Sequence, residues 1–256
     1  MPKPPYDSLE PPPTMGDLIA AAWRLARPVA PQLAGVWLVL TAASAVSLQA
    51  SASVGLGPRP LFSAAQFAST LAQTLALALI SAATLRLLLQ PGAAWRRVDA
   101  GLGAYVAVNV LVALLPQLET VALRAMTSST VGLARGMSLL SLANTLIYPL
   151  AIWVCLRLLL WPIGLLLGEA AAAPGRSWAR MRGVVWPSAL TFLVLGAPPL
   201  LAGTLPLFHY IRLHDLASAL LAAPFLAVYA VVANLIPAAV YRLRARGDGG
   251  MAAVFD

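Results

Sequence analysis

Two histidines are the residues of this chain with the widest range of chemistry, and they lie close together. His209 and His214 belong to one short stretch, and Asp215 follows directly. Imidazole and carboxylate groups bind zinc, but a zinc site needs three or four ligands that converge on one point. The sequence places few other acidic residues near this stretch. We therefore interpret it as an exposed loop, a weak metal-site candidate at most, and expect no bound metal and no other cofactor.

Three charged residues lie next to predicted kinks at similar positions in apolar segments. Arg86 is about one helical turn before Pro91, Arg157 is about one turn before Pro162, and Glu169 follows that second proline. An ionisable group inside a membrane span costs about 2.5–3.5 kcal/mol on insertion scales, so it usually has a partner or reaches water. We expect Glu169 to fold back and pair with Arg157 or Arg86. The alternative is that each side chain extends separately to the membrane surface.

A second group of residues combines polar side chains with helix breakers inside apolar segments. The group consists of Glu119, Asn144, Asn234, Gly196, Pro198 and Pro199. Proline removes backbone hydrogen bonds, and a broken helix at membrane depth survives only when it is buried in protein or lines a cavity. We interpret them as a structural ion pair at Glu119 and as kinks that let helices pack. The alternative is that these residues line a polar cavity beside a broken fifth span.

Composition places all these residues in a membrane protein. The 256 residues are 60% hydrophobic and 10% charged, and the mean hydropathy is +0.82, whereas soluble domains carry about 25% charged residues. The net charge of +8 comes from arginines that flank apolar segments. Such arginines set topology and contact anionic headgroups, so we expect lipid partners and no nucleic acid. The near absence of lysine indicates a GC-rich bacterial coding bias and hence a bacterial inner membrane.

Tryptophan followed by arginine occurs three times, each time before a pair of long apolar stretches. The clusters contain Trp23, Arg24 and Arg27; Trp95, Arg96 and Arg97; and Trp178, Arg180 and Arg182. Side chains of these types are typical of the membrane interface, where they contact lipid headgroups. The recurrence predicts either a three-fold repeat of one interfacial helix plus two spans, or the arginine pattern that any six-span topology imposes.

The sequence therefore predicts an all-α membrane protein with six transmembrane helices and three cytoplasmic interfacial amphipathic helices. Thr14 and Asp17 are typical of a capping box at the start of the first interfacial helix, which we expect to end at Pro28 and Pro31. Residues 1–13 are expected to form a disordered Pro-rich tail, 14–246 the membrane domain and 247–256 a flexible tail. The first interfacial helix is predicted at 14–27, and the spans at about 32–50, 64–90, 104–126, 138–161, 184–208 and 216–241.

The orientation follows from the distribution of basic residues. With both termini in the cytoplasm, eleven lysines and arginines lie on the inner side and four on the outer side. Because short cytoplasmic loops carry an excess of Lys and Arg, both termini are predicted to be cytoplasmic.

Two segments resemble the glycerophosphoryl diester phosphodiesterase membrane-domain family. The first is MGDLIAAAWRLARPVAPQLAGVWLVL at 15–40, and the second is RLLLWPIGLLLGEAAAAPGRSWARMRGVVWP at 157–187. In the second segment the similar positions are Arg157, Pro162, Glu169, Ser177, Trp178, Gly183 and Trp186. In fused members of that family a separate soluble barrel performs hydrolysis, and this chain contains no such segment. The resemblance therefore implies a six-span membrane module and not a phosphodiesterase.

No arrangement of residues in the sequence predicts catalysis. Ser, His and Asp do not come together on one predicted side of the membrane, and no Gly-rich phosphate loop follows a strand. We expect a non-catalytic, lipid-associated scaffold or accessory subunit of a membrane complex, with a membrane-protein partner or a second copy of the chain as its protein contact. The alternative is a small transporter or lipid-handling channel with a site at the broken fifth span.

Overall fold

The computed structural model describes residues 12–53, 64–90, 92, 97–112, 149–169, 172–213 and 216–245, and within these ranges the regular structure is entirely helical. The labelled elements are α1 (Met15–Ala26), a 3₁₀ turn η1 (Arg27–Val29), α2 (Ala30–Ser53), α3 (Ala64–Leu89), α6 (Leu160–Leu166), α7 (Pro174–Arg180), α8 (Val185–Leu213) and α9 (Leu216–Ala245). Two further helical segments cover Ala100–Val112 and residues 149–158.

Five helical stretches in the described ranges are long and apolar enough to cross a membrane. They are Met15–Val46, Thr70–Leu89, Pro149–Leu166, Val185–Pro206 and Ala217–Arg244. The chain is therefore a multi-pass helical membrane protein. Ala100–Val112 is apolar but, at 1.5 Å per residue, only about 20 Å long, whereas the hydrocarbon core is about 30 Å thick. Residues 113–148, where the third span was predicted to end and the fourth to begin, lie outside the described residues, so six spans remain a prediction.

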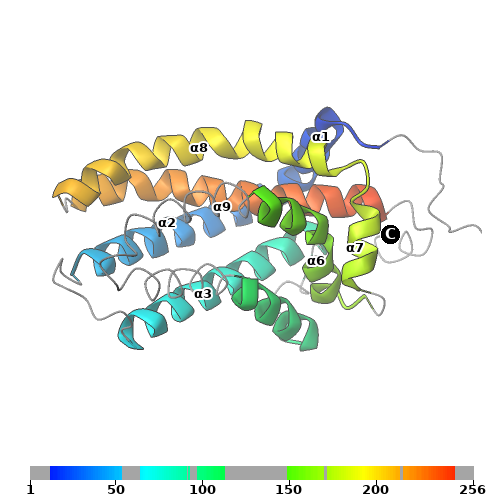
Figure 1. Ribbon diagram of the computed structural model, residues 1–256. Coiled ribbons are helices and arrows are strands. Elements are labelled where there is room, and N and C mark those ends of the chain that lie inside the picture. The colour runs from blue at the N-terminus through cyan, green and yellow to red at the C-terminus, as the bar shows by residue number, and fades with distance from the viewer. Residues whose placement is uncertain are drawn as a thin grey trace, which may run out of the picture.

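The long helices run side by side, and α1, α6 and α7 gather at one end of them (Figure 1). The central element is α9, which contacts α8, α2, α1, α3 and α6. The end where α1 and α7 meet the last turns of α9 carries arginines on each of these helices, including Arg24, Arg180 and Arg244. We call it the basic end of the bundle.

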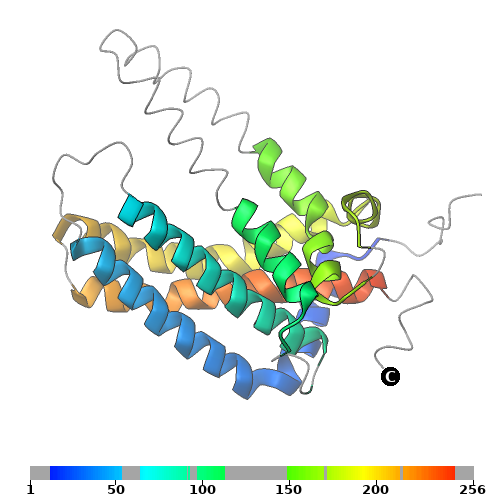
Figure 2. The ribbon, with the colours of Figure 1, turned by 90° about the horizontal axis from the view of Figure 1, so that it is seen from below.

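The first interfacial helix begins as predicted. The Thr14 side chain accepts a hydrogen bond from the Asp17 N–H at 3.3 Å, and Asp17 Oδ2 accepts from the Thr14 N–H at 2.8 Å, which makes a capping box. Helix α1 ends at Ala26, next to the predicted end at Pro28, and η1 leads directly into α2 at Ala30, so that Pro31 lies in the first turn of α2. Proline is tolerated where a helix starts, since the N–H that it lacks would be unsatisfied there. Figure 2 shows that the chain changes direction between α1 and α2.

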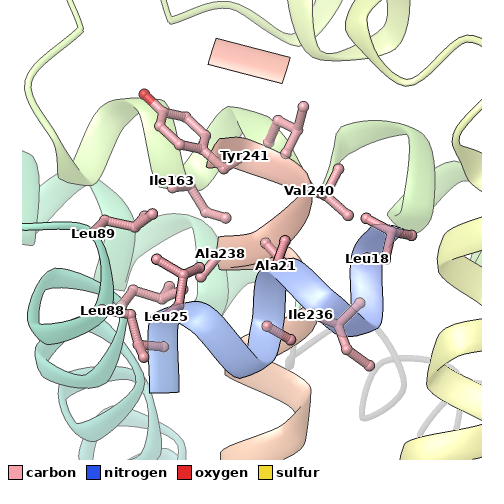
Figure 3. Close-up of a cluster of buried hydrophobic side chains, with 14 of the residues drawn as sticks. Leu18, Ala21, Leu25, Leu88, Leu89, Ile163, Ile236, Ala238, Val240 and Tyr241 are labelled. Atoms are coloured by element: carbon pink, nitrogen blue, oxygen red, sulfur yellow. The ribbon is translucent and has the colours of Figure 1, made fainter. Parts of the chain in front are cut away.

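Helix α1 lies across the basic end with its apolar stripe inward. Leu18, Ala21 and Leu25 are buried against α9 residues that include Ile236 and Val240 (Figure 3). Positions three and four apart share one face of a helix, so the spacing of these residues fixes which side of α1 is covered. The buried apolar residues of α1 therefore attach this capped helix to the bundle.

The alternative of a broken fifth span is wrong. Helix α8 is continuous from Val185 to Leu213 although Pro198, Pro199 and Pro206 lie within it. Gly196 leaves space that the Tyr229 ring of α9 fills, since a Cβ there would be 3.3 Å from that ring, and Gly203 would meet Leu226 at 3.1 Å. The small residues let two long helices approach closely, as is common in membranes. This arrangement matches the packing interpretation and not a broken helix.

Candidate functional site

Arg86 is the most buried charged side chain at the basic end, with 2% of its surface exposed. Its Nη2 atom lies 2.6 Å from Asp99 Oδ1 and donates to the Leu166 carbonyl oxygen at 3.0 Å, while Nη1 donates to the Arg97 carbonyl. A buried guanidinium is tolerated because several acceptors replace its water shell. Arg86 thus connects α3 with the segment before Ala100 and with the end of α6.

The partners predicted for Glu169 are wrong. Its carboxylate accepts from Arg180 Nη1 at 3.2 Å and from the Tyr241 hydroxyl, and it pairs with neither Arg86 nor Arg157. The expectation that Glu169 folds back onto the bundle is met, but through α7 and α9. Neither partner could be found from spacing, because Tyr241 is 72 residues from Glu169 and Asp99 is 13 residues from Arg86, outside the same helix.

Arg157 is held by aromatic rings. Its guanidinium lies 5.2 Å from the Trp153 ring centre and 5.4 Å from that of Trp178, and Nη1 donates to the Trp178 carbonyl at 3.2 Å. The two indole rings meet edge to face at 4.9 Å. Stacking of this kind stabilises an arginine that lacks a carboxylate partner.

The helix that contains Arg157 is interrupted at Leu159, two residues before Trp161, and Ser177 of α7 compensates for the interruption. The Ser177 hydroxyl donates to the Arg157 carbonyl at 2.9 Å and accepts from the Leu160 N–H at 3.2 Å. Both backbone groups are freed by the break, and an unsatisfied group in a membrane interior is costly. The helix is therefore interrupted before Trp161-Pro162, and α6 (Leu160–Leu166) continues beyond the break.

The Trp-Arg clusters do not share one environment. Trp23 is 70% exposed, and Arg24 and Arg27 are exposed beside it. Trp178 and Arg180 are half-buried and serve the internal contacts described above, which departs from their predicted role at headgroups. Of the other cluster members, Arg97 and Arg182 are exposed, and Trp95 and Arg96 lie outside the described residues.

A pocket of about 330 Å³ lies at the basic end between α1, α3 and α9. Arg24 and Arg242 line it together with apolar residues that include Leu25, Val29 and Leu88. Arg24 keeps its Nε near the Ala20 carbonyl at 3.3 Å, so its guanidinium stays over the surface of α1. Two cationic side chains beside apolar walls suit an anionic headgroup together with its first methylene groups. We call this the basic pocket.

A second cavity, of about 260 Å³, lies within the bundle and is lined by Ser81, Tyr105, Asn109, Cys155 and Asn234 among apolar residues. Asn234 is thus placed on a cavity as predicted, but the cavity lies between α3, α6, α9 and the Ala100–Val112 helix. Gly196, Pro198 and Pro199 of α8 do not line it. Glu119 and Asn144 lie outside the described residues.

His209 belongs to the last part of α8, and His214 and Asp215 lie outside the described residues. Within the ranges that the structure describes, no three His, Cys, Asp or Glu residues are close enough to hold a metal ion.

Comparisons with protein-family models, with curated proteins and with solved structures find no match for this chain. The resemblance to the glycerophosphoryl diester phosphodiesterase membrane-domain family therefore remains a prediction. Fold and site together define a multi-pass helical membrane protein with an ion-paired, arginine-rich end.

Proposed function

We propose that this chain is a non-catalytic, lipid-associated membrane protein whose basic end binds anionic headgroups. The observation that supports the proposal most directly is the basic pocket, where Arg24 and Arg242 stand beside apolar walls at the level of the amphipathic helix α1. Exposed Trp23 on the same helix belongs to the residue types that prefer the membrane interface. In this role the protein is a scaffold or accessory subunit of a membrane complex.

The proposal includes the topology predicted from the sequence. The chain crosses a bacterial inner membrane six times, both termini are cytoplasmic, and the basic end faces the anionic cytoplasmic leaflet. Cytoplasmic loops of membrane proteins collect arginine and lysine, and each such residue near an anionic surface contributes about 1 kcal/mol of attraction. The transporter alternative loses its predicted position, because α8 is continuous at Gly196, Pro198 and Pro199.

Native mass spectrometry after extraction into polymer nanodiscs tests the headgroup proposal. We expect retained phosphatidylglycerol in preference to phosphatidylcholine, and a loss of about fivefold or more in that retention in Arg24→Gln and Arg242→Gln. Arg176→Gln is the matched control, because Arg176 is exposed on α7 and does not line the basic pocket. A melting temperature for each variant shows that it is folded. Equal retention of both lipids, or equal losses in all three variants, would overturn the proposal.

The same spectra test the scaffold role. A second protein or a second copy of the chain that stays bound at fixed stoichiometry is the expected result. A protein that is always monomeric and carries only lipid would contradict the scaffold role while leaving headgroup binding intact.

A further inference from the structure

The cavity inside the bundle is a second site, and none of its described lining residues also lines the basic pocket. Ser81 lies eight residues before the end of α3 at Leu89, so the polar part of the cavity is about 12 Å from the basic end along that helix. At this depth water is scarce, and polar side chains are kept only where they bond with one another or with a ligand.

Three helices contribute one chain of hydrogen bonds to the cavity wall. Asn234 Nδ2 donates to the Ala230 carbonyl at 2.8 Å, which fixes the orientation of the amide and turns Oδ1 toward the Ser81 hydroxyl. Ser81 donates its single hydroxyl proton to that Oδ1 atom. Because Ser81 has no second proton, the Tyr105 hydroxyl, 3.0 Å away, must be the donor in the bond that joins it to Ser81.

This network leaves hydrogen-bonding capacity toward the cavity. Asn109 Nδ2 donates to the Tyr105 carbonyl at 2.9 Å, which uses one of its two protons. Among the described residues, the bonds of Asn234 leave one of its amide protons for a further partner, while the Asn109 amide also interacts with the Tyr105 hydroxyl and keeps its Oδ1 acceptor. A molecule with a hydroxyl or carbonyl group can accept from the Asn234 amide, and a hydroxyl can also donate to Asn109 Oδ1.

The other residues that line the cavity determine the charge and polarity of the rest of such a molecule. Among the described residues that line the cavity none is charged, so a charged group would lose its water shell to these residues without compensation. The other lining residues are mainly apolar and include Leu85, Leu158 and Trp161. Pockets of this kind, apolar with a few convergent polar groups, are typical of small-molecule sites.

The cavity is open toward the side of the bundle. Val112 and Cys155 both line it, and both side chains are exposed. Its volume corresponds to about eight or nine water molecules at 30 Å³ each, which is enough for a small polar group and a few methylene groups. A longer apolar chain would have to extend out of the cavity past Val112 and Cys155.

We propose that this cavity binds an uncharged amphiphile from the membrane, with its hydroxyl or carbonyl group at Asn109 and Asn234 and its apolar body toward Cys155. Monoacylglycerols have this chemistry. The site is independent of the headgroup proposal, since the ligand is neutral and Arg24 and Arg242 do not contact the cavity.

Cys155 is the single cysteine of the chain and serves as a reporter of occupancy. The experiment measures the rate at which N-ethylmaleimide modifies Cys155 of the full chain in nanodiscs, with and without 1-oleoylglycerol. We expect 1-oleoylglycerol to slow modification by about fivefold or more and phosphatidylglycerol to have no such effect. Absence of protection by 1-oleoylglycerol, or equal protection by both lipids, would overturn the proposal.

Two variants connect the protection to the polar wall. Asn109→Leu removes an amide whose described bond is to its own helix, so we expect the fold to persist and the protection to fall by about fivefold. Asn234→Leu is expected to have the same effect. Thr191→Val is the matched control, because Thr191 is buried, bonds to the Pro187 carbonyl of its own helix and does not line the cavity. Unchanged protection in folded Asn109→Leu and Asn234→Leu protein would overturn the assignment to these amides.

Discussion

Asp99 is held in its charged form by donors on two sides. The Leu102 N–H donates to its carboxylate at 2.9 Å, and Arg86 lies 2.6 Å away, so the pKa of Asp99 falls below its ordinary value near 3.8. A lowered folded-state pKa means that the stabilisation is complete above about pH 4 and is lost as the pH falls through the folded-state pKa. Asp99→Asn should lower the melting temperature at pH 7 through the loss of about 1–2 kcal/mol.

The pH dependence separates this effect from a general loss of packing. Melting temperatures between pH 7 and pH 3 should converge for the native protein and Asp99→Asn as the pH falls, because protonation removes the same charge that the variant lacks. A difference that stays constant down to pH 3 would contradict the role of the charge.

Ser177 has a structural role that its small side chain does not suggest. Ser177→Ala would leave the Leu160 N–H and the Arg157 carbonyl without the hydroxyl that now satisfies both, and an unsatisfied buried group costs about 1–3 kcal/mol. We expect a clear drop in melting temperature and in extraction yield.

Ser188 provides the control for that substitution. It is as buried as Ser177, but its hydroxyl has no hydrogen-bond partner in the described part of the chain. Ser188→Ala should therefore be neutral or slightly stabilising. Equal losses in the two alanine variants would mean that burial, and not the repair of the helix break, explains the effect at Ser177.

At the scale of elements, the start of the Ala100–Val112 helix packs on the end of α6 with no space between them. A Cβ at Gly101 would lie 2.6 Å from the Leu165 carbonyl oxygen and 3.0 Å from that of Leu166. Backbone atoms cannot move aside as a flexible side chain can, so Gly101→Ala should push the helix away from α6 and disturb the nearby Arg86 contacts. We expect a loss of about 1–3 kcal/mol, measured as a lower melting temperature.

Gly103 lies in the same helix and has open space around its Cβ position. Gly103→Ala should be neutral or stabilising by up to about 1 kcal/mol, since alanine favours the helix more than glycine does. If both glycine variants lost stability equally, the close contact with α6 would not be the cause.

The elements themselves could be predicted from the sequence to a large extent, because their signals are local. The Thr14 cap, the apolar stripe of α1 and the long apolar stretches of α3, α8 and α9 follow from spacing alone. The partners of Arg86 and Glu169 could not be predicted in this way. Asp99 and Tyr241 reach these charges through tertiary packing, and a charge at a given depth can be satisfied by any acceptor or donor at that depth.

Of the residues predicted to line a cavity, only Asn234 lines the internal cavity among the described residues, for a related reason. A proline pair such as Pro198-Pro199 indicates a local backbone effect, whereas a cavity depends on which helices meet. Serine and tyrosine are common in membrane helices, and the positions of Ser81 and Tyr105 in the sequence do not connect them with Asn234.

At the scale of the whole molecule, the contacts of Arg86 constrain how often the chain crosses the membrane. Arg86 bonds to Asp99 and to the Leu166 carbonyl, so the segment between these two residues starts and finishes at the basic end. Its second half, Pro149–Leu166, is apolar and long enough to span a membrane toward that end. If Pro149–Leu166 crosses the membrane toward the basic end, the chain must first have crossed away from that end after Asp99. The Ala100–Val112 helix would then belong to a sixth crossing.

An even number of crossings would place α1 and the end of α9 on one side of the membrane, which agrees with their common position at the basic end (Figure 1). Reporter fusions test this directly in cells of a bacterial host. Fluorescent protein joined to either terminus should mature in the cytoplasm, and alkaline phosphatase inserted after Ser128, in the predicted outer turn, should be active outside. Termini on opposite sides of the membrane would mean an odd number of crossings. That result would contradict a crossing formed by the Ala100–Val112 helix before Pro149–Leu166.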